Sequence, residues 1–185
     1  MLKNLINNEK SDKDTIHSYI DVYENLLCSK KESATHILEL GVLDGGSIKL
    51  WKDYFKNAIV YGLDIKDSTK GWDGVIDDRI KLIFNENAYS RTYVRKHFQN
   101  MKFDMLLDDG PHSLESMKQF ITLYLPLLKD DGILIIEDVQ SIEWIDHLTL
   151  ITPDKYKDNI WTFDRRFLKD RYDDIIFCID LSKKN

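Results

Sequence analysis

The chain has 185 residues and carries 26 Lys and Arg against 32 Asp and Glu, a formal net charge of -6. That length suits one domain, and 43% hydrophobic with 31% charged residues is a globular mixture rather than the composition of a disordered chain. The negative balance disfavours a broad nucleic-acid surface, because phosphate binding relies on Lys and Arg. We therefore expect residues 1–185 to form one domain without a nucleic-acid partner.

The cysteine pattern indicates a reducing compartment, and the first ten residues indicate a cytosolic protein. Cys28 and Cys178 lie far apart and form no CxxC pattern, so we expect two buried thiols rather than a disulfide. The first ten residues lack the apolar stretch of a signal peptide, and no apolar run approaches the roughly 20 residues that span a bilayer. We therefore expect a cytosolic protein without a membrane partner.

After a polar start, residues 15–27 show apolar side chains three or four positions apart, which is the period of one helical face. The residues of this face are Ile16, Tyr19, Ile20, Tyr23 and Leu27. The pattern predicts an amphipathic helix over 15–27, within an N-terminal helical segment of about 11–30.

Short apolar runs then alternate with helical patterns. The predicted strands are 36–40, 59–65, 80–84, 103–110 and 132–138, followed by β-rich runs at 160–163 and 174–181. The predicted helices are 48–55, about 90–98 and 114–128. This rhythm predicts an α/β fold, a Rossmann-like three-layer αβα sandwich with a seven-stranded, mostly parallel sheet.

A glycine-containing turn joins the first predicted strand to its helix, with the sequence Glu39-Leu-Gly-Val-Leu-Asp-Gly-Gly46. Glycine lets the backbone approach a ligand, and Asp64 ends the next strand, where a carboxylate can accept hydrogen bonds from ribose hydroxyls. The pair favours an adenosine-containing ligand. Leu43 stands where a GxGxxG run has its second glycine, so a pyrophosphate is disfavoured and adenosylmethionine fits better than a nicotinamide dinucleotide.

Acidic residues end two strands that we expect to be neighbours, in Asp108-Asp109-Gly-Pro-His112 and in Glu137-Asp138. Parallel strands lie roughly 4.8 Å apart, so these carboxylates should meet, and a hard cation such as Mg2+ would relieve their repulsion. His112 could then accept a proton from a metal-bound hydroxyl. Each residue also has a structural reading, as part of a turn, a surface histidine or a solvated strand end.

These blocks resemble the class I methyltransferases related to the macrolide-sugar O-methyltransferases of mycinamicin and macrocin type and to the cephalosporin-hydroxylase-like group. The resemblance covers nearly the whole chain in six ordered blocks. The blocks are 11–19 with Tyr23-Glu24, 38–47 with 50–55, 61–65, 107–113, 134–139 and 171–175. The chain departs from the family pattern at Pro111, where Ser is usual, and at 85–89, where Asn-Glu-Asn-Ala-Tyr replaces Gly-Asp-Gln-Ser-Asp.

The resemblance implies that residues 1–185 form a single methyltransferase domain that depends on S-adenosylmethionine and Mg2+ or another divalent cation. The implied metal ligands are Asp109, Glu137 and Asp138, with His112 as the general base. The implied donor pocket contains Glu39, Gly41, Gly46, Asp64, Asn87 and Asp108, of which Asp64 binds the ribose and Asn87 the adenine.

We expect the acceptor to be a small polyhydroxylated molecule, with a sugar or glycoside preferred. From its length of 185 residues, we expect the chain to lack the auxiliary N-terminal domain of the macrolide-sugar enzymes. Acceptor contacts should therefore come from the N-terminal helix, the segment after Asp138 or a partner subunit in a homo-oligomer. The candidates are Lys13, Tyr19, Trp144 and Arg165. Three alternatives stay open: a catechol- or phenol-type O-methyltransferase, a non-catalytic module that binds the donor, and a nicotinamide oxidoreductase.

Overall fold

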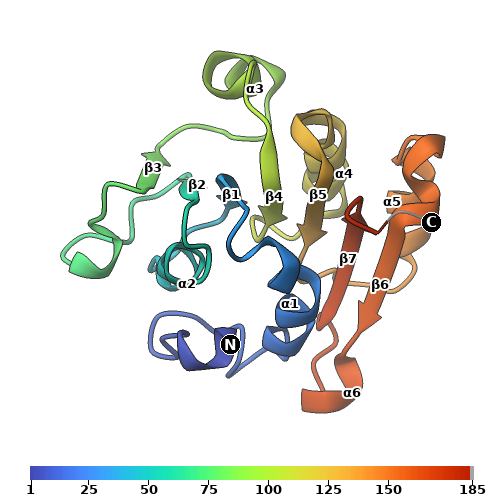
Figure 1. Ribbon diagram of the computed structural model, residues 1–185. Coiled ribbons are helices and arrows are strands. Elements are labelled where there is room, and N and C mark those ends of the chain that lie inside the picture. Colours follow the sequence, from blue (N-terminus) through green and yellow to red (C-terminus); the bar gives the residue numbers. More distant parts are fainter. Residues whose placement is uncertain (184–185) are drawn as a thin grey trace.

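The computed structural model describes residues 1–183, and over that range the chain forms a seven-stranded sheet in the order β3-β2-β1-β4-β5-β7-β6 (Figure 1). The strands are β1 (His36–Leu40), β2 (Ile59–Asp64), β3 (Ile80–Phe84), β4 (Phe103–Asp108), β5 (Leu128–Ile136), β6 (Ile160–Asp164) and β7 (Ile175–Asp180). Strands β1 to β5 run parallel, and β7 is antiparallel to both β5 and β6. The predicted fold class is confirmed.

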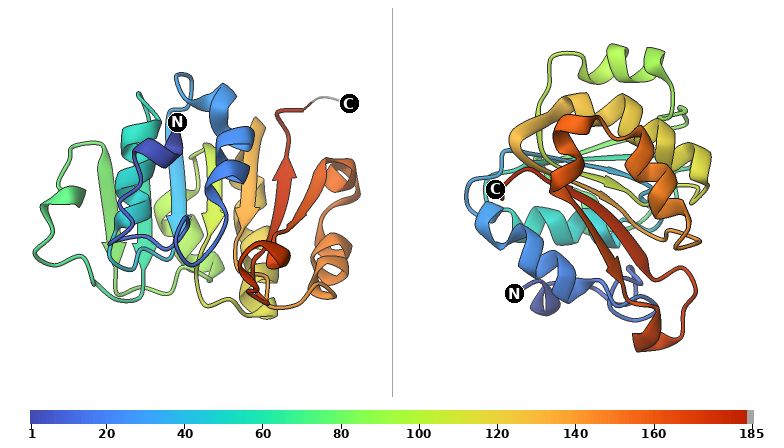
Figure 2. Two further views of the ribbon diagram at one scale, coloured as in Figure 1. Left: turned by 90° about the horizontal axis from the view of Figure 1, so that it is seen from below. Right: turned by 90° about the vertical axis from the view of Figure 1, so that its right-hand side faces the viewer.

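Helices cover both faces of the sheet, as Figure 2 shows in its right-hand view. One face packs against α1 (Ile20–Leu27) and α2 (Gly46–Tyr54), and the other against α3 (Arg91–Phe98), α4 (Leu114–Tyr124) and α5 (Trp144–Ile151). The short α6 (Arg166–Lys169) lies between β6 and β7. Because both faces are covered, every residue of β4 and β7 is buried, which explains why most of their residues are apolar.

Two predicted boundaries are wrong in the middle of the chain. The helix expected over 114–128 ends at Tyr124 and continues as a 3-10 turn, Leu125–Leu127, because Pro126 has no backbone N–H for an α-helical hydrogen bond. Strand β5 begins at Leu128 rather than Gly132, since Leu128 pairs with Phe103 across a register shift. The charged residues that follow Leu128 broke the apolar pattern, so the sequence did not predict the first part of β5.

The predicted helix over 15–27 is also wrong at its start, because α1 begins at Ile20. Residues 11–19, which we call the N-terminal segment, form turns instead, and Ile16 is 48% exposed rather than part of a buried face. The expected helical segment of about 11–30 is therefore confined to α1 and the 3-10 turn Cys28–Lys30. Cys178 is buried as predicted, but Cys28 is exposed.

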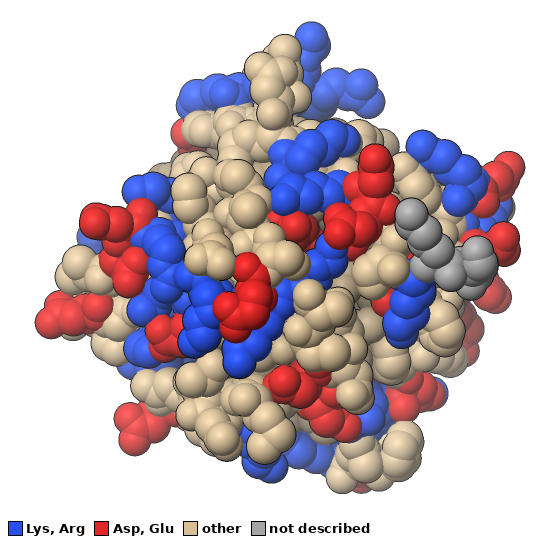
Figure 3. All heavy atoms as spheres, viewed as in Figure 1, with Lys and Arg blue, Asp and Glu red and all other residues tan. Residues whose placement is uncertain are grey.

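The exterior is mixed in charge and in polarity. Over the face in Figure 3, basic and acidic side chains are interspersed, so this face is not the uniformly basic surface that nucleic-acid binding uses. Among the helices formed by residues 1–183, none combines the length and apolar character required to span a bilayer.

Candidate functional site

A cavity of about 450 Å³ opens at the carboxyl ends of β1, β2, β4 and β5. Strand order reverses between β1 and β4, and open α/β sheets bind ligands at such a switch point. The cavity is lined by Asp12, Leu40, Gly41, Leu43, Leu63, Asp64, Ile65, Glu86, Asn87, Ala88, Tyr89, Asp109, Gly110, Pro111, His112 and Asp138. The sheet thus brings both predicted constellations, the glycine turn and the acidic strand ends, to one cavity.

Asp64 organises the turn after β1. Its Oδ2 accepts hydrogen bonds from the backbone N–H groups of Val42 at 2.8 Å and Leu43 at 3.1 Å, and its Oδ1 accepts one from Lys66 at 3.0 Å. A carboxylate offers about four acceptor positions, so roughly one stays available toward the cavity. That is enough for one ribose hydroxyl.

The same end of the cavity fits a purine nucleoside. Leu43 and Ile65, on either side of Asp64 in the cavity lining, are 69% and 70% exposed. Large apolar side chains at a cavity mouth suit a flat aromatic base, and Asn87 adds an amide for its polar edge. The residues present therefore fit the nucleoside of a methyl donor.

Three other predicted donor residues lie behind the cavity wall. Glu39 is fully buried, and its Oε2 accepts a hydrogen bond from Trp51 Nε1 at 2.9 Å. Asp108 is 3% exposed and accepts a hydrogen bond from the Tyr89 hydroxyl. Burial raises the pKa of each of these two carboxyls to about 7. Gly46 packs against the Lys10 carbonyl. Because Glu39, Gly46 and Asp108 do not line the cavity, their contacts with a donor stay predictions.

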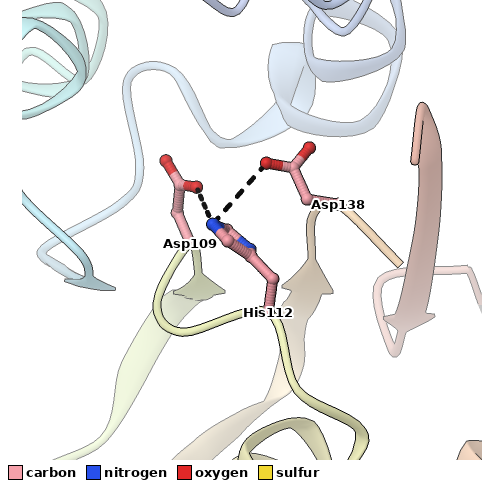
Figure 4. A group of neighbouring side chains, drawn as sticks. All are labelled: Asp109, His112 and Asp138. Carbon is pink, nitrogen blue, oxygen red and sulfur yellow. Dashed lines mark ion pairs between the residues drawn. The ribbon is translucent and has the colours of Figure 1, made fainter. Parts of the chain in front are cut away.

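The predicted metal site brings two carboxylates and one imidazole together, as Figure 4 shows. His112 Nε2 lies 3.9 Å from Asp109 Oδ1 and 3.7 Å from Asp138 Oδ2. Each of the three residues offers a ligand atom, and these atoms lie within 4.8 Å of one another. Hard carboxylate oxygens with an adjacent imidazole suit a divalent cation, so these residues fit the implied metal.

The backbone at this site is held in an uncommon conformation. His112 has a φ of 53° and Asp138 a φ of 52°, in the left-handed region that costs a residue with a side chain about 1–3 kcal/mol. The loop after His112 is fixed because Ser113 caps α4 through its hydrogen bond from Ser116 N. The surrounding structure therefore fixes the backbone from which the His112 and Asp138 side chains extend.

Glu137 is not part of the group around His112. Its Oε1 accepts a hydrogen bond from the Tyr23 hydroxyl and its Oε2 one from Lys13 Nζ. It is 1% exposed, and burial raises its pKa well above the ordinary value although Lys13 opposes the rise. To bind a metal, Glu137 would have to exchange Lys13 for the ion, so its predicted metal contact stays a prediction.

Sequence reasoning missed the part that Lys13 plays. Lys13 and Tyr19 were candidates for acceptor contacts, but the structure buries both against carboxylates, with Lys13 Nζ 2.7 Å from Asp109 Oδ2 and the Tyr19 hydroxyl 2.6 Å from Asp138 Oδ1. The only signal was that 11–19 is one of the blocks that carry the family resemblance.

The other two acceptor candidates lie outside the cavity lining. Trp144, on α5, is partly buried against the core formed by α3 to α5. Arg165 forms an ion pair with Asp21 at 2.6 Å. Neither residue lines this cavity, and their acceptor contacts stay predictions.

Comparison with known proteins gives one family and several relatives. A family model described as a methyltransferase domain matches residues 38–139. The chain is 30% identical over 142 residues to the 8-demethyl-8-alpha-L-rhamnosyl tetracenomycin-C 2'-O-methyltransferase of Streptomyces olivaceus. This match covers 72% of this chain and 36% of that protein. It is 29% identical over 136 residues to the L-olivosyl-oleandolide 3-O-methyltransferase of Streptomyces antibioticus, with 70% and 34% covered. The chain thus spans about a third of the length of these curated relatives.

A solved structure shares the fold. The MycE methyltransferase from the mycinamycin biosynthetic pathway, in complex with Mg, SAH and mycinamycin VI, matches with a TM-score of 0.69 and 19% identity. The match covers 90% of this chain and 50% of that one. At this identity the similarity establishes a common fold.

Proposed function

The chain belongs to the methyltransferase domain family, and on that premise we propose that it transfers a methyl group from S-adenosylmethionine to a hydroxyl of a small polyhydroxylated acceptor, a sugar or glycoside, with a divalent cation such as Mg2+. The observation that carries the proposal is the convergence of Asp109, His112 and Asp138 on a cavity that also contains Gly41 and Asp64. The names of both curated relatives, which are sugar O-methyltransferases, support the acceptor class. The Mg and SAH of the solved structure support the cation and the donor.

In this proposal the two reactants share the cavity. Asp64, Leu43 and Ile65 would bind the nucleoside of the donor, and Asp109, His112 and Asp138 would face the acceptor hydroxyl. Methyl transfer is an in-line displacement at carbon, so the acceptor oxygen must lie behind the methyl group of the donor. Holding both reactants in this geometry supplies several kcal/mol of the rate enhancement.

Two carboxylates and one imidazole are available to activate the acceptor hydroxyl. Asp109 and Asp138 would hold the cation, which would supply a Lewis acid that lowers the pKa of this hydroxyl. His112 Nε2 lies within 4 Å of both carboxylates and accepts the proton of that hydroxyl. The loop conformation at His112 keeps the imidazole facing the same point as the carboxylates.

A methyl-transfer screen tests the proposal. The protein is incubated with methyl-labelled S-adenosylmethionine and either diol-bearing glycosides or catechols, with Mg2+ or with EDTA, and Asp109→Asn serves as the inactive control. We expect label on glycosides, dependent on Mg2+. Label on catechols alone would establish the phenol-type alternative instead.

Two further results would contradict catalysis of this kind. Donor binding by calorimetry without label on any acceptor, with or without Mg2+, would make the chain a non-catalytic binding module. Binding of NAD in place of S-adenosylmethionine would make it an oxidoreductase. Both measurements use the same protein preparation as the screen.

A further inference from the structure

The N-terminal segment brings three buried polar side chains to the carboxyl edge of the sheet. Lys13 is 2% exposed, His17 4% and Tyr19 1%. Buried polar groups are costly unless they are paired, and each of these three contacts a carboxylate that follows a strand or precedes one. The segment is therefore built into the interior of the site rather than laid over it.

Lys13 holds one side of the Asp109 carboxylate. Its Nζ lies 2.7 Å from Asp109 Oδ2, whereas Asp109 Oδ1 lies 3.9 Å from His112 Nε2. The two oxygens of Asp109 therefore have different partners, Lys13 for Oδ2 and His112 for Oδ1.

Asp138 is divided in the same way. Its Oδ1 accepts a hydrogen bond from the Tyr19 hydroxyl at 2.6 Å and lies 3.3 Å from His17 Nδ1. His17 Nδ1 also lies 3.1 Å from Asp174 Oδ1, so the imidazole is held between two carboxylates. The other oxygen of Asp138, Oδ2, lies 3.7 Å from His112 Nε2.

We propose that Lys13, Tyr19 and His17 are positioning residues of the metal site, which fix one oxygen of Asp109 and one of Asp138 so that the second oxygen of each faces the cation beside His112. Figure 4 shows the outcome, with both carboxylates directed at the imidazole and the N-terminal chain, in faint blue, running past them. This inference rests on the proposed function, because it assumes that the site binds a divalent cation.

Lys13 also contacts the third carboxylate of the predicted metal set. Its Nζ donates a hydrogen bond to Glu137 Oε2, and Glu137 Oε1 accepts one from the Tyr23 hydroxyl. Lys13 therefore links Asp109 to Glu137.

The test measures binding of Mn2+ to the full chain by the loss of its free-ion electron paramagnetic resonance signal, without donor or acceptor. Residues that orient metal ligands typically contribute 10- to 100-fold to affinity, so we expect Tyr19→Phe to weaken Mn2+ binding by about that factor. Tyr54→Phe is the control, because Tyr54 is an equally buried tyrosine whose hydroxyl binds a carboxylate outside the site, that of Glu24. It should bind Mn2+ as the wild type does. We further expect Asp138→Asn to abolish Mn2+ binding.

The outcomes separate this inference from the function on which it rests. A wild-type protein that binds no Mn2+ contradicts the metal-dependent function. Wild-type binding with unchanged affinity in Tyr19→Phe, or a loss of affinity in Tyr54→Phe equal to that in Tyr19→Phe, overturns the inference alone. Calorimetry with S-adenosylmethionine and thermal unfolding confirm that each variant is folded. If Tyr19→Phe does not fold, His17→Gln gives the same readout, because His17 contacts the same Asp138 oxygen.

Discussion

Gly41 packs against the backbone of Asp109 so closely that a Cβ on Gly41 would lie 1.8 Å from the Asp109 carbonyl oxygen. Gly41 also has a φ of 88°, in the left-handed region that favours glycine. The glycine turn after β1 and the loop that carries Asp109 are thus in direct backbone contact. A change in one must displace the other.

Gly41→Ala should therefore be much more destabilising than the same change at Gly71. Gly71 has a similar φ of 81° but no atom within 4 Å of the position that its Cβ would take. We expect Gly71→Ala to lower the free energy of unfolding by about 1–2 kcal/mol through backbone strain alone. Gly41→Ala adds a clash and should cost about 3 kcal/mol or more. Urea denaturation of both variants measures the difference, and equal losses would contradict the close packing.

Asp64→Asn should weaken binding of S-adenosylmethionine by about 10- to 100-fold, because it removes a charged acceptor from a ligand hydroxyl. Asp67→Asn is the matched control. Asp67 also accepts hydrogen bonds within a loop, from the backbone and side chain of Thr69, but it does not line the cavity. Calorimetry on both variants provides the comparison. Similar affinities would show that Asp64 serves only the turn.

His112→Ala should reduce turnover by about 10²- to 10⁴-fold, the usual contribution of a general base, while S-adenosylmethionine still binds. The control is His147→Ala, since His147 is exposed on α5 and does not line the cavity. Turnover is measured with saturating donor and the best acceptor of the screen. Full activity in His112→Ala would remove this residue from the mechanism.

Glu39→Gln should change how stability depends on pH. Burial raises the pKa of Glu39 from 4.5 to about 7 in the folded protein, so the folded state retains a proton that the unfolded state releases. The stability from this proton is fully present below about pH 4.5 and is lost as pH rises through about 7. Gln cannot titrate. The free energy of unfolding of Glu39→Gln should therefore rise relative to the wild type across this window, whereas parallel pH profiles would contradict the shift.

The strands could be predicted from the sequence because burial on both faces turns them into apolar runs with clear ends. The start of α1 could not be predicted. Residues 15–19 have the apolar spacing of a helix, but the Tyr19 hydroxyl forms a hydrogen bond with Asp138 and the segment is not helical. At this point a tertiary hydrogen bond outweighs local periodicity. Helix α5 was not predicted, although its sequence is largely apolar.

The site was predictable where its residues are local. Asp109 and His112 share one loop, and Asp138 follows the adjacent strand, so strand order alone brings them together. The ion pair between Lys13 and Asp109 could not be predicted, because the two residues are 96 positions apart and no spacing rule connects them. Repulsion among the carboxylates suggested a cation, and the protein supplies one positive charge from its own chain.

The N-terminal segment also determines when the site can exist during synthesis of the protein. Tyr19 emerges 119 residues before Asp138, and His17 emerges 157 residues before Asp174. Contacts between such distant positions form late, because a long loop must close before they add stability. Until Asp174 leaves the ribosome, His17 of the nascent chain lacks one of its carboxylate partners, so assembly of the proposed metal site becomes a late step in folding.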